Sequence, residues 1–258
     1  MGQSKHINDE KEQLLRDVTF EKFKHLAKNN SLSKYEKIGF YNGLRKGYEE
    51  KIFADIINKL PNLKKKHQVV MDIGPGCSEL PFMLIKLCYE MNHTLLLIDS
   101  QEMLDHLPNE SFIEKVPAYY PYGCVEFMER YQQQINTILS YSVFHYVFAE
   151  MNYLDFLDNS LELLVDGGQM LIGDIPNVSM RKRFFSSANG IQFHQRANNT
   201  IEFPDVRFNQ LEKGAIDDSV ILSILQRCRN FGFDAYILPQ PKELPMSNRR
   251  EDILISKP

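Results

Sequence analysis

The sequence predicts an α/β fold in which a mostly parallel sheet is covered by helices on both faces. From about Val69 onward, short apolar runs alternate with longer stretches of helical periodicity, and this β-α-β-α order is typical of a doubly wound sheet. The apolar runs carry Val, Ile or Leu at successive positions, which indicates strands buried on both sides. The last two runs are joined by a short proline-rich loop, so we expect them to form an antiparallel hairpin.

Seven strands and five helices follow from this pattern. The predicted strands cover residues 69–73, 94–99, 111–116, 135–141, 169–175, 234–240 and 251–257. The predicted helices cover residues 80–91, 103–107, 124–134, 153–164 and 218–233. In the helix at 153–164 the apolar residues repeat at a spacing of three to four, which predicts one buried stripe, and Gly167 and Gly168 are expected to end it.

Two segments fall outside this alternation. Residues 1–64 are charged and helical in pattern, and we expect them to form an N-terminal helical cover that includes a strip of Gly, Tyr and Arg at 37–51. The remaining chain, 65–258, is expected to form one domain. An insertion at about 176–216, rich in turn residues and without clean periodicity, interrupts it.

The composition excludes several classes of function. The formal charge of −4 over 258 residues lacks the basic excess of a nucleic-acid-binding protein. No apolar stretch approaches the roughly 18 residues of a membrane span, and the polar N-terminus has no secretory pattern. The four cysteines are scattered without the spacing of metal ligands. We therefore expect a cytoplasmic protein with no metal site and no nucleic-acid or membrane partner, and the oligomeric state stays open.

The stretch VMDIGPGCS at 70–78 ends the first strand with a carboxylate and two glycines. Glycine loses more backbone freedom on folding than any other residue, so a pair of them indicates a sharp turn or a close approach to a ligand. At the carboxyl edge of a central parallel strand, this turn lies where open α/β sheets bind ligands. Asp99 ends the second strand, 23 residues after Gly76, where a carboxylate can accept hydrogen bonds from ribose hydroxyls.

Two classes of nucleotide cofactor use this arrangement. A dinucleotide site has the pattern GxGxxG, with a third glycine at the helix N-terminus on which the pyrophosphate lies. Here the corresponding residue is Glu79, whose carboxylate would repel a phosphate. An adenosyl cofactor without phosphate is compatible with this residue, and Asp72 favours a cationic ligand.

These residues resemble class I S-adenosylmethionine (SAM)-dependent methyltransferases. DIGPGCS is similar to their motif I, although the third glycine of that motif is Ser78 here. Asp99 matches the acidic end of their second strand, and INTILSYSVFHYV resembles their fourth strand and the turn after it. LVDGGQMLIGD resembles the entry to the fifth strand, and the C-terminal hairpin matches the last two. The resemblance spans about 65–258 and implies a Rossmann-like sheet of seven strands.

The resemblance also implies the cofactor and the residues that bind it. SAM is expected to place its ribose hydroxyls on Asp99, its methionine moiety along Gly74–Gly76, and its adenine between the loops after the second and third strands. The acidic residue that many members have after the third strand is absent from VPAYYPYG. The predicted cofactor-binding residues are Asp72, Gly74, Pro75, Gly76, Ser78, Asp99, Ser100, Met103, Ser140 and Tyr141.

Three residues are candidates for catalysis. His145 follows the fourth strand, and a neutral imidazole there can accept the proton of a hydroxyl acceptor near pH 7. Tyr141 can orient an acceptor, and Asp174, at the end of the fifth strand, can hold an acceptor hydroxyl. The alternatives are that His145 and Tyr141 only pack in the core and that Asp174 only begins the turn at Pro176.

Six residues are candidates for substrate binding: Tyr41, Arg45, Tyr146, Arg181, Arg183 and His194. The arginines of the insertion suit a phosphate or carboxylate on the substrate. Alternatively, these arginines form a solvated loop face. Tyr41, Arg45 and Tyr48 of the N-terminal strip can close over the carboxylate of the cofactor.

The sequence thus favours an enzyme that transfers a methyl group from SAM to a small molecule, with O-methylation ahead of N-methylation. A sugar or phosphorylated precursor of a bacterial capsule or surface polysaccharide is one acceptor suggested by the resemblance. The alternative is a non-catalytic module with the same fold that regulates or scaffolds a partner enzyme.

Overall fold

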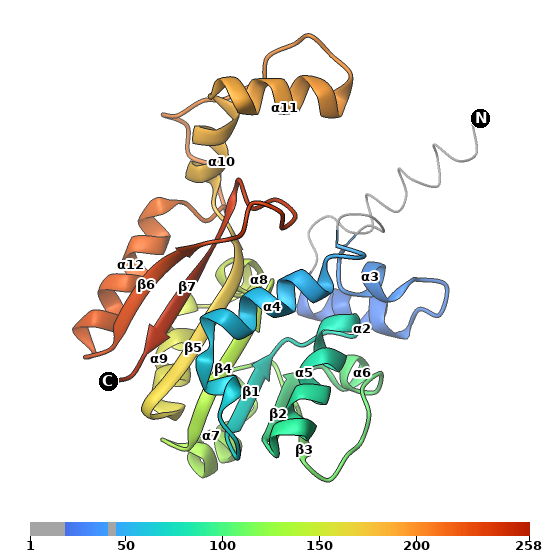
Figure 1. Cartoon of the computed structure of the whole chain (residues 1–258), viewed down its shortest axis with the longest axis vertical. Coiled ribbons are helices and arrows are strands. Elements are labelled where there is room, and N and C mark those ends of the chain that lie inside the picture. Colours follow the sequence, from blue (N-terminus) through green and yellow to red (C-terminus); the bar gives the residue numbers. More distant parts are fainter. Residues whose placement is uncertain (1–18, 41–44) are drawn as a thin grey trace.

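In the computed structural model, which describes residues 19–40 and 45–258, seven strands form one sheet in the order β3-β2-β1-β4-β5-β7-β6 (Figure 1). The neighbours from β3 to β5 are parallel, and β7 is antiparallel to both β5 and β6. The predicted fold class and the C-terminal hairpin are confirmed. The strands are β1 (Val69–Ile73), β2 (Thr94–Asp99), β3 (Ile113–Pro117), β4 (Ile135–Tyr141), β5 (Leu164–Pro176), β6 (Asp234–Pro239) and β7 (Arg250–Ser256).

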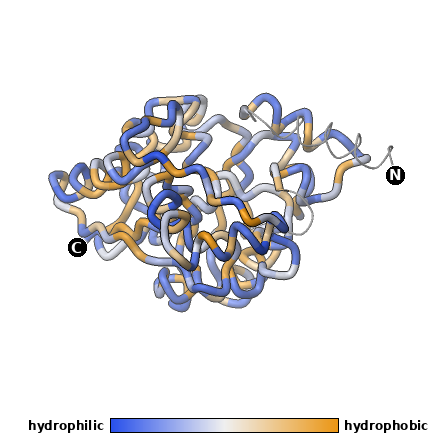
Figure 2. The backbone as a smooth tube through the Cα atoms, turned by 90° about the horizontal axis from the view of Figure 1, so that it is seen from above, coloured by the Kyte–Doolittle hydropathy of each residue, from blue (hydrophilic) through white to orange (hydrophobic). Residues whose placement is uncertain are grey.

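Helices cover both faces of this sheet. Figure 2 shows that they alternate hydrophilic and hydrophobic stretches, as expected of helices that bury one side. The described chain contains α2 (Phe20–Lys28), α3 (Lys34–Lys37), α4 (Glu49–Lys59), the 3-10 helix η1 (Pro61–Lys64), α5 (Glu79–Met91), α6 (Gln101–Leu104), α7 (Val125–Tyr131), α8 (Phe144–Glu150), α9 (Tyr153–Leu163), α10 (Val178–Phe185), α11 (Ala188–Asn198) and α12 (Asp218–Asn230).

The strands are apolar at successive positions because each face of the sheet has its own core. Along β2, Leu95 and Leu97 pack with α4, α5 and α6, whereas Leu96 and Ile98 pack with α7, α8, α9 and α12 on the other face. All four side chains are almost completely buried. The absence of polar alternation in the sequence therefore follows from the coverage of both faces.

The start of β5 differs from the prediction. Helix α9 ends at Leu163, and β5 begins at once, so Gly167 and Gly168 lie in the strand instead of ending the helix. Gly167 has a φ of 74°, and the pairing with β4 shifts register just before Gln169. The glycines thus mark an irregular strand start, a role that glycine also has in bulges.

The N-terminal segment contains two parts with different packing. Helix α4 belongs to the core, since Ile56 and Leu60 are fully buried in the same cluster as Val70 of β1. Helices α2 and α3 lie instead over the carboxyl edge of the sheet (Figure 1). The predicted domain boundary at residue 64 therefore lies between α4 and β1, whose side chains share this hydrophobic cluster.

The predicted insertion is more regular than the sequence indicated. It forms α10 and α11, which extend away from the sheet as an arm (Figure 1), and an irregular segment from Asn199 to Asp217. Its aromatic and turn residues obscure the helical period because the arm has little core to face. In the described part of the chain, no helix has the length and hydrophobicity needed to cross a membrane.

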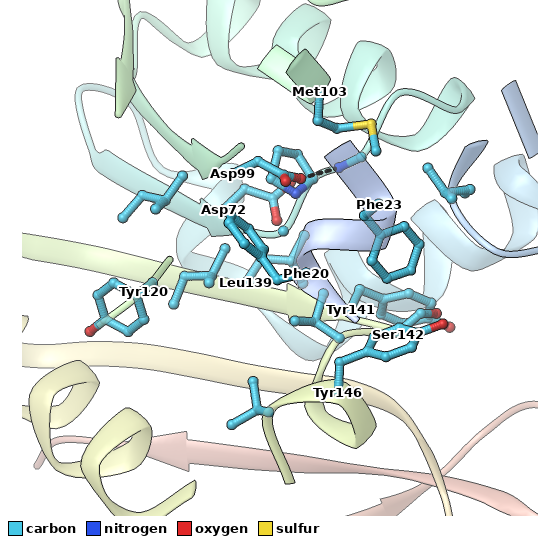
Figure 3. Close-up of a pocket in the computed structure, with 18 of the residues that line it drawn as sticks. Phe20, Phe23, Asp72, Asp99, Met103, Tyr120, Leu139, Tyr141, Ser142 and Tyr146 are labelled. Carbon is cyan, nitrogen blue, oxygen red and sulfur yellow. Dashed lines mark hydrogen bonds between the residues drawn. The ribbon is translucent and has the colours of Figure 1, made fainter. Parts of the chain in front are cut away.

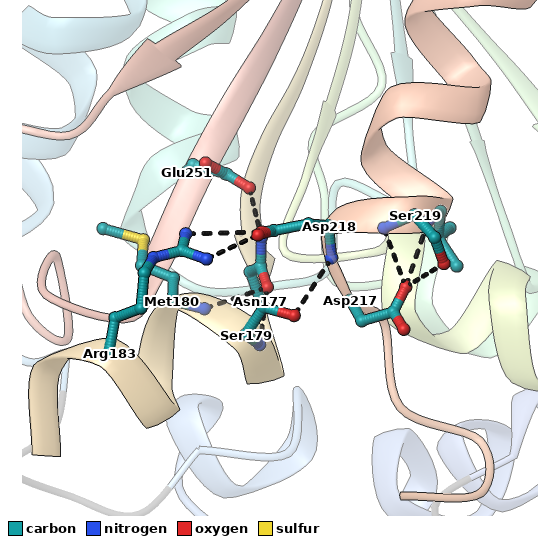
Figure 4. A network of polar contacts seen from close by, with 9 residues as sticks. Asn177, Ser179, Met180, Arg183, Asp217, Asp218, Ser219 and Glu251 are labelled. Atoms are coloured by element: carbon teal, nitrogen blue, oxygen red, sulfur yellow. Dashed lines mark hydrogen bonds and ion pairs between the residues drawn. The ribbon is translucent and has the colours of Figure 1, made fainter. Parts of the chain in front are cut away.

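Polar contacts fix the root of the arm. The Asn177 amide donates to Asp218 Oδ1 at 2.8 Å and to Glu251 Oε1 at 2.6 Å, which joins the end of β5 to α12 and β7 (Figure 4). Asn177 is buried, and its oxygen caps α10 by accepting from two backbone N–H groups. Arg183 adds an ion pair to Asp218. Contacts with both α12 and β7 therefore hold the base of the arm.

The packing of α12 predicts a sharp difference between two neighbouring substitutions. Ile224→Ala removes a side chain that is 0% exposed, and it should lower the free energy of unfolding by about 2–5 kcal/mol. Leu222→Ala, on the same helix but 57% exposed, should change it by no more than about 0.5 kcal/mol. Urea denaturation measures both, and equal effects would contradict the position of α12 on the sheet.

Candidate functional site

A cavity of about 120 Å³ lies at the carboxyl ends of β1, β2 and β4. Strand β1 connects to β2 on one side and pairs with β4 on the other, so the cavity lies where the strand order reverses. Figure 3 shows carboxylates on one side of it and aromatic side chains on the other. Of the predicted site residues, those that line it are Arg45, Asp72, Gly74, Pro75, Gly76, Ser78, Asp99, Met103, Tyr141 and Tyr146.

Gly74 and Gly76 form the turn that leaves β1, and both need left-handed backbone, with φ of 72° and 66°. A Cβ on Gly74 would lie 2.6 Å from Cγ2 of Val143, and one on Gly76 would lie 2.8 Å from Cγ2 of Ile38. Val143, which precedes α8, and Ile38, which follows α3, thus pack against the turn. Glycine is required by this packing as well as by the conformation.

Asp72 is a buried carboxyl that makes no ion pair or hydrogen bond within the described chain. It is 5% exposed and faces the cavity. Burial, with a contribution from the nearby Asp99 carboxylate, raises the pKa of Asp72 to about 8, and Arg45 opposes this shift. A cationic group in the cavity would stabilise the ionised form, so the site is suited to a positively charged ligand.

Asp99 ties the glycine turn to the end of β2. Its Oδ2 accepts from the Gly76 N–H at 3.2 Å (Figure 3). Its Oδ1 accepts from the Ser100 N–H at 2.7 Å. Burial raises the pKa of Asp99 to about 6, while these two backbone donors oppose the shift. A carboxylate has about four acceptor positions, so two remain for hydroxyl groups of a ligand.

Two predicted cofactor residues are buried beside the cavity and do not line it. Ser100 accepts from the Met103 N–H at 3.2 Å and so caps α6, which places Met103 in the cavity wall. Ser140 is fully buried, and its hydroxyl has no hydrogen-bond partner in the described chain. Ser78, by contrast, lines the cavity with a buried hydroxyl that also has no partner there.

Arg45 brings a positive charge to the same cavity. The side chain is 5% exposed, and Nη1 donates to Ser142 Oγ at 3.0 Å. Its guanidinium carbon lies 5.0 Å from the ring centre of Phe40 and 5.3 Å from that of Tyr141. Arg45 forms no salt bridge with any carboxylate in the described chain, which leaves a buried cation at the cavity wall.

Ser142, which follows β4, joins Arg45 to Asp174 near the end of β5. Ser142 and Asp174 both have left-handed backbone, with φ of 62° and 59°, and the Ser142 hydroxyl donates to the Asp174 carboxylate. Asp174 also bonds Arg250 and does not line the cavity. Tyr141 does line it, and its ring is seated on Gly173, where a Cβ would come within 2.3 Å of Cδ2.

His145 and Tyr146 occupy different positions on α8. The Tyr146 ring faces the cavity and meets Phe23 of α2 edge-on at 4.9 Å between ring centres (Figure 3). His145 lies against the Tyr146 ring at 3.9 Å and does not line the cavity. Burial lowers the pKa of His145 to about 4, and its Nδ1 has no partner in the described chain. The imidazole is therefore neutral near pH 7.

Helix α2 contributes residues that the sequence did not assign to the site. Phe20 stacks on Tyr119 at 4.7 Å between ring centres, and its N–H donates to both oxygens of Glu150 at 3.1 Å. The apolar stripe of α2 is visible in the sequence. That this stripe covers a cavity is not, because it depends on contacts with residues 119–150 of the chain.

The remaining substrate candidates lie elsewhere. Arg181 and Arg183 are on the arm, where they pair with Glu212 and Asp218, and His194 bonds Asn198 on α11. None of the three lines the cavity. Tyr41 lies outside the described residues. Within the ranges 19–40 and 45–258, no group of His, Cys, Asp and Glu side chains is arranged to hold a metal ion.

No protein-family model matches the sequence, and no curated protein matches it. Solved structures do. The plantazolicin methyltransferase BpumL, in complex with a triazolic desmethylPZN analog and S-adenosylhomocysteine (SAH), matches with a TM-score of 0.54 and 13% identity over 96% of this chain and 98% of its own. A proposed S-adenosylmethionine-dependent methyltransferase from Methanococcus maripaludis gives 0.50 and 16% over 93% of both chains.

A chain of the complex between the Haloferax volcanii Trm112 methyltransferase activator and a proposed methyltransferase gives a TM-score of 0.53 and 11% identity over 92% of this chain and 97% of its own. Together with the strand order and the antiparallel β7, these similarities show that the chain has the class I methyltransferase fold. The resemblance seen in the sequence is confirmed at the level of fold.

The environment of Asp72 predicts how stability depends on pH. The unliganded folded protein retains a proton on Asp72 that the unfolded chain releases above about pH 4, so this group makes the protein less stable as pH rises from about 4 to about 8. Asp72→Asn should therefore gain stability relative to wild type across that range. Urea denaturation at several pH values measures this, with the exposed Asp234→Asn as control. A constant difference between Asp72→Asn and wild type would contradict the raised pKa.

Proposed function

We propose that this protein is a SAM-dependent methyltransferase that acts on a small-molecule acceptor. The observation that carries the proposal is the pair of carboxyl groups, Asp72 and Asp99, at a glycine turn in the cavity where the strand order reverses. SAM carries positive charge on its sulfonium and α-ammonium groups, and its ribose has two adjacent hydroxyls. These two features complement an unpaired buried carboxyl and a carboxylate with free acceptor positions.

The residues present fit this cofactor. Asp72 faces the α-ammonium and sulfonium charges, and Asp99 accepts from the ribose hydroxyls. Met103 after β2 and Ala118 and Tyr119 after β3 line the part of the cavity in which adenine is expected. The buried hydroxyl of Ser78, which has no partner in the described chain, is a further polar group for the ligand.

Bound SAM supplies a methyl group on a sulfonium, and the protein must align the acceptor and exclude water. The aromatic side chains of Phe23 and Tyr146 close the cavity beside the end of β4. We propose that Tyr146 contacts the acceptor. His145 stays our predicted proton acceptor, since its imidazole is neutral near pH 7 and lies against the ring of Tyr146, which lines the cavity.

The narrower proposal is O-methylation of a sugar or phosphorylated precursor of a bacterial surface polysaccharide. It rests on the resemblance alone. Arg181 and Arg183, which suggested an anionic acceptor, are paired with carboxylates on the arm. A second candidate function, a non-catalytic module that binds SAM, would be identified by cofactor binding without turnover.

Cofactor binding is tested at Asp99. Asp99→Ala removes two charge-assisted hydrogen bonds to the ribose, on the order of 2–4 kcal/mol together, so SAH should bind roughly 30-fold to 1000-fold more weakly. Asp99→Asn keeps the shape and should show a smaller loss. Asp105→Asn, at the residue that follows α6 and outside the cavity, should bind as wild type. Calorimetry measures this, and unchanged affinity in Asp99→Ala, or tighter binding of NADH than of SAM by wild type, would rule out the assignment.

Turnover is tested by following SAH release from SAM in the presence of pooled cellular small molecules, and then with the acceptor so identified. His145→Ala should lower kcat at least about tenfold with little change in SAM affinity. His145→Phe, which keeps a ring against Tyr146, should be equally slow if the nitrogen is the base. Because the pKa of His145 is about 4, kcat/KM should not decline through this group between pH 8 and pH 5. Full turnover by His145→Phe would reduce His145 to a packing residue.

A further inference from the structure

Arg45 is a buried cation that has no anionic partner in the described chain. Nη1 is held by the Ser142 hydroxyl, whereas the buried Nε has no hydrogen-bond partner. A buried charge without a counter-ion is costly, and the guanidinium lies at the wall of the ligand cavity. An anionic group on a ligand in that cavity would complete its environment.

The Ser142 hydroxyl determines how the guanidinium is presented. A hydroxyl has one hydrogen to donate, and Ser142 donates it to Oδ2 of Asp174, which leaves its lone pairs for Nη1 of Arg45. Ser142 and Asp174 both have left-handed backbone, with φ of 62° and 59°, a conformation that is strained for residues other than glycine. Ser142 directly follows β4, and Asp174 lies where the pairing of β5 with β7 shifts register, so both strained residues sit where regular strand geometry is interrupted.

Asp174 is in turn held from three sides. Arg250 Nη1 donates to its Oδ2 at 2.7 Å and to its backbone oxygen at 3.1 Å. Gln240 Nε2 lies 3.4 Å from Oδ1 of Asp174. The backbone N–H of Asp174 donates to Oδ1 of Asp252 at 2.8 Å. With these partners its carboxylate is an anchor for Ser142.

The polar contacts of Asp174 continue through Asp252 to helix α4. The fully buried Asp252 forms an ion pair with Lys59 of α4 at 2.7 Å, and Lys59 pairs with Asp55 at 2.6 Å. Helix α4 follows the segment that carries Arg45, and β7 lies at the other side of β5. A continuous series of polar contacts thus runs from Arg45 through Ser142, Asp174 and Asp252 to Lys59.

We infer that Ser142 and Asp174 are positioning residues that hold Arg45 for the α-carboxylate of the methionine moiety. The inference rests on the proposed function, because the anion is taken to belong to SAM. The same guanidinium would suit a carboxylate on the acceptor, and the experiment separates these sources. Asp72 and Arg45 would then bind the two charged ends of one amino acid, the ammonium and the carboxylate.

The test compares SAH with its decarboxylated analogue, which keeps the adenosine, the thioether and the amine. Wild type should prefer SAH by at least about tenfold in calorimetric Kd. Arg45→Met, Ser142→Ala and Asp174→Asn should each lose most of that preference by weakening SAH alone. Because the three act as one unit, Arg45→Met combined with Asp174→Asn should lose no more than Arg45→Met. Thr137→Val, a buried isosteric change elsewhere on β4, should keep the preference.

The outcomes are distinguishable. If wild type binds neither SAH nor SAM, the proposed function fails, and the inference fails with it. If wild type binds SAH and the three variants keep its preference over the decarboxylated analogue, Arg45 does not bind the cofactor carboxylate and the inference is overturned, while the proposed function stands. A variant that weakens both ligands equally has only a structural effect. Should Asp174→Asn not fold, Ser142→Ala and Arg45→Met still decide the question.

Discussion

Three adjacent strands of the sheet adopt strained backbone near the same edge, and the site depends on how they do so. Strand β1 ends just before Gly74 and β4 just before Ser142, whereas Asp174 lies within β5 where its pairing with β7 shifts register, and all three residues have a positive φ. Only the first of these residues is a glycine. The other two have a strained backbone, and the hydroxyl of Ser142 donates to the carboxylate of Asp174 beside the cavity. The turn after β1 is also packed directly against Val143, so these strand ends support one another.

The charges around the cavity follow from this arrangement. Asp72 and Asp99 stand on the side of β1 and β2, and Arg45 reaches the cavity from the N-terminal segment. Asp99 is stabilised by backbone N–H groups, whereas Asp72 and Arg45 have no partner of opposite charge in contact within the described chain. A zwitterionic ligand would satisfy both, which connects the electrostatics of the cavity to the proposed cofactor.

The two extensions of the domain have different relations to the site. Helix α2 covers the cavity with Phe20 and Phe23, and Glu150 binds the start of that helix. The arm of α10 and α11 is instead held at its root by Asn177, and Arg181 and Arg183 of α10 pair with carboxylates. In this structure the cover forms the wall of the site, and the arm presents a separate surface.

The local pattern of the sequence predicted the parallel strands, the terminal hairpin and the glycine turn with Asp99, because burial on both faces and left-handed turns leave a direct mark on residue choice. Most of the predicted cofactor-binding residues line one cavity at the predicted edge of the sheet, because they follow from these elements. Other features have no local signature. Whether Asp174 faces a ligand or anchors Ser142, whether Arg183 meets a substrate or Asp218, and whether α2 covers a cavity all depend on contacts between segments far apart in the chain. Tertiary packing alone brings those partners together, and it therefore decided which charged residues are free to bind a ligand.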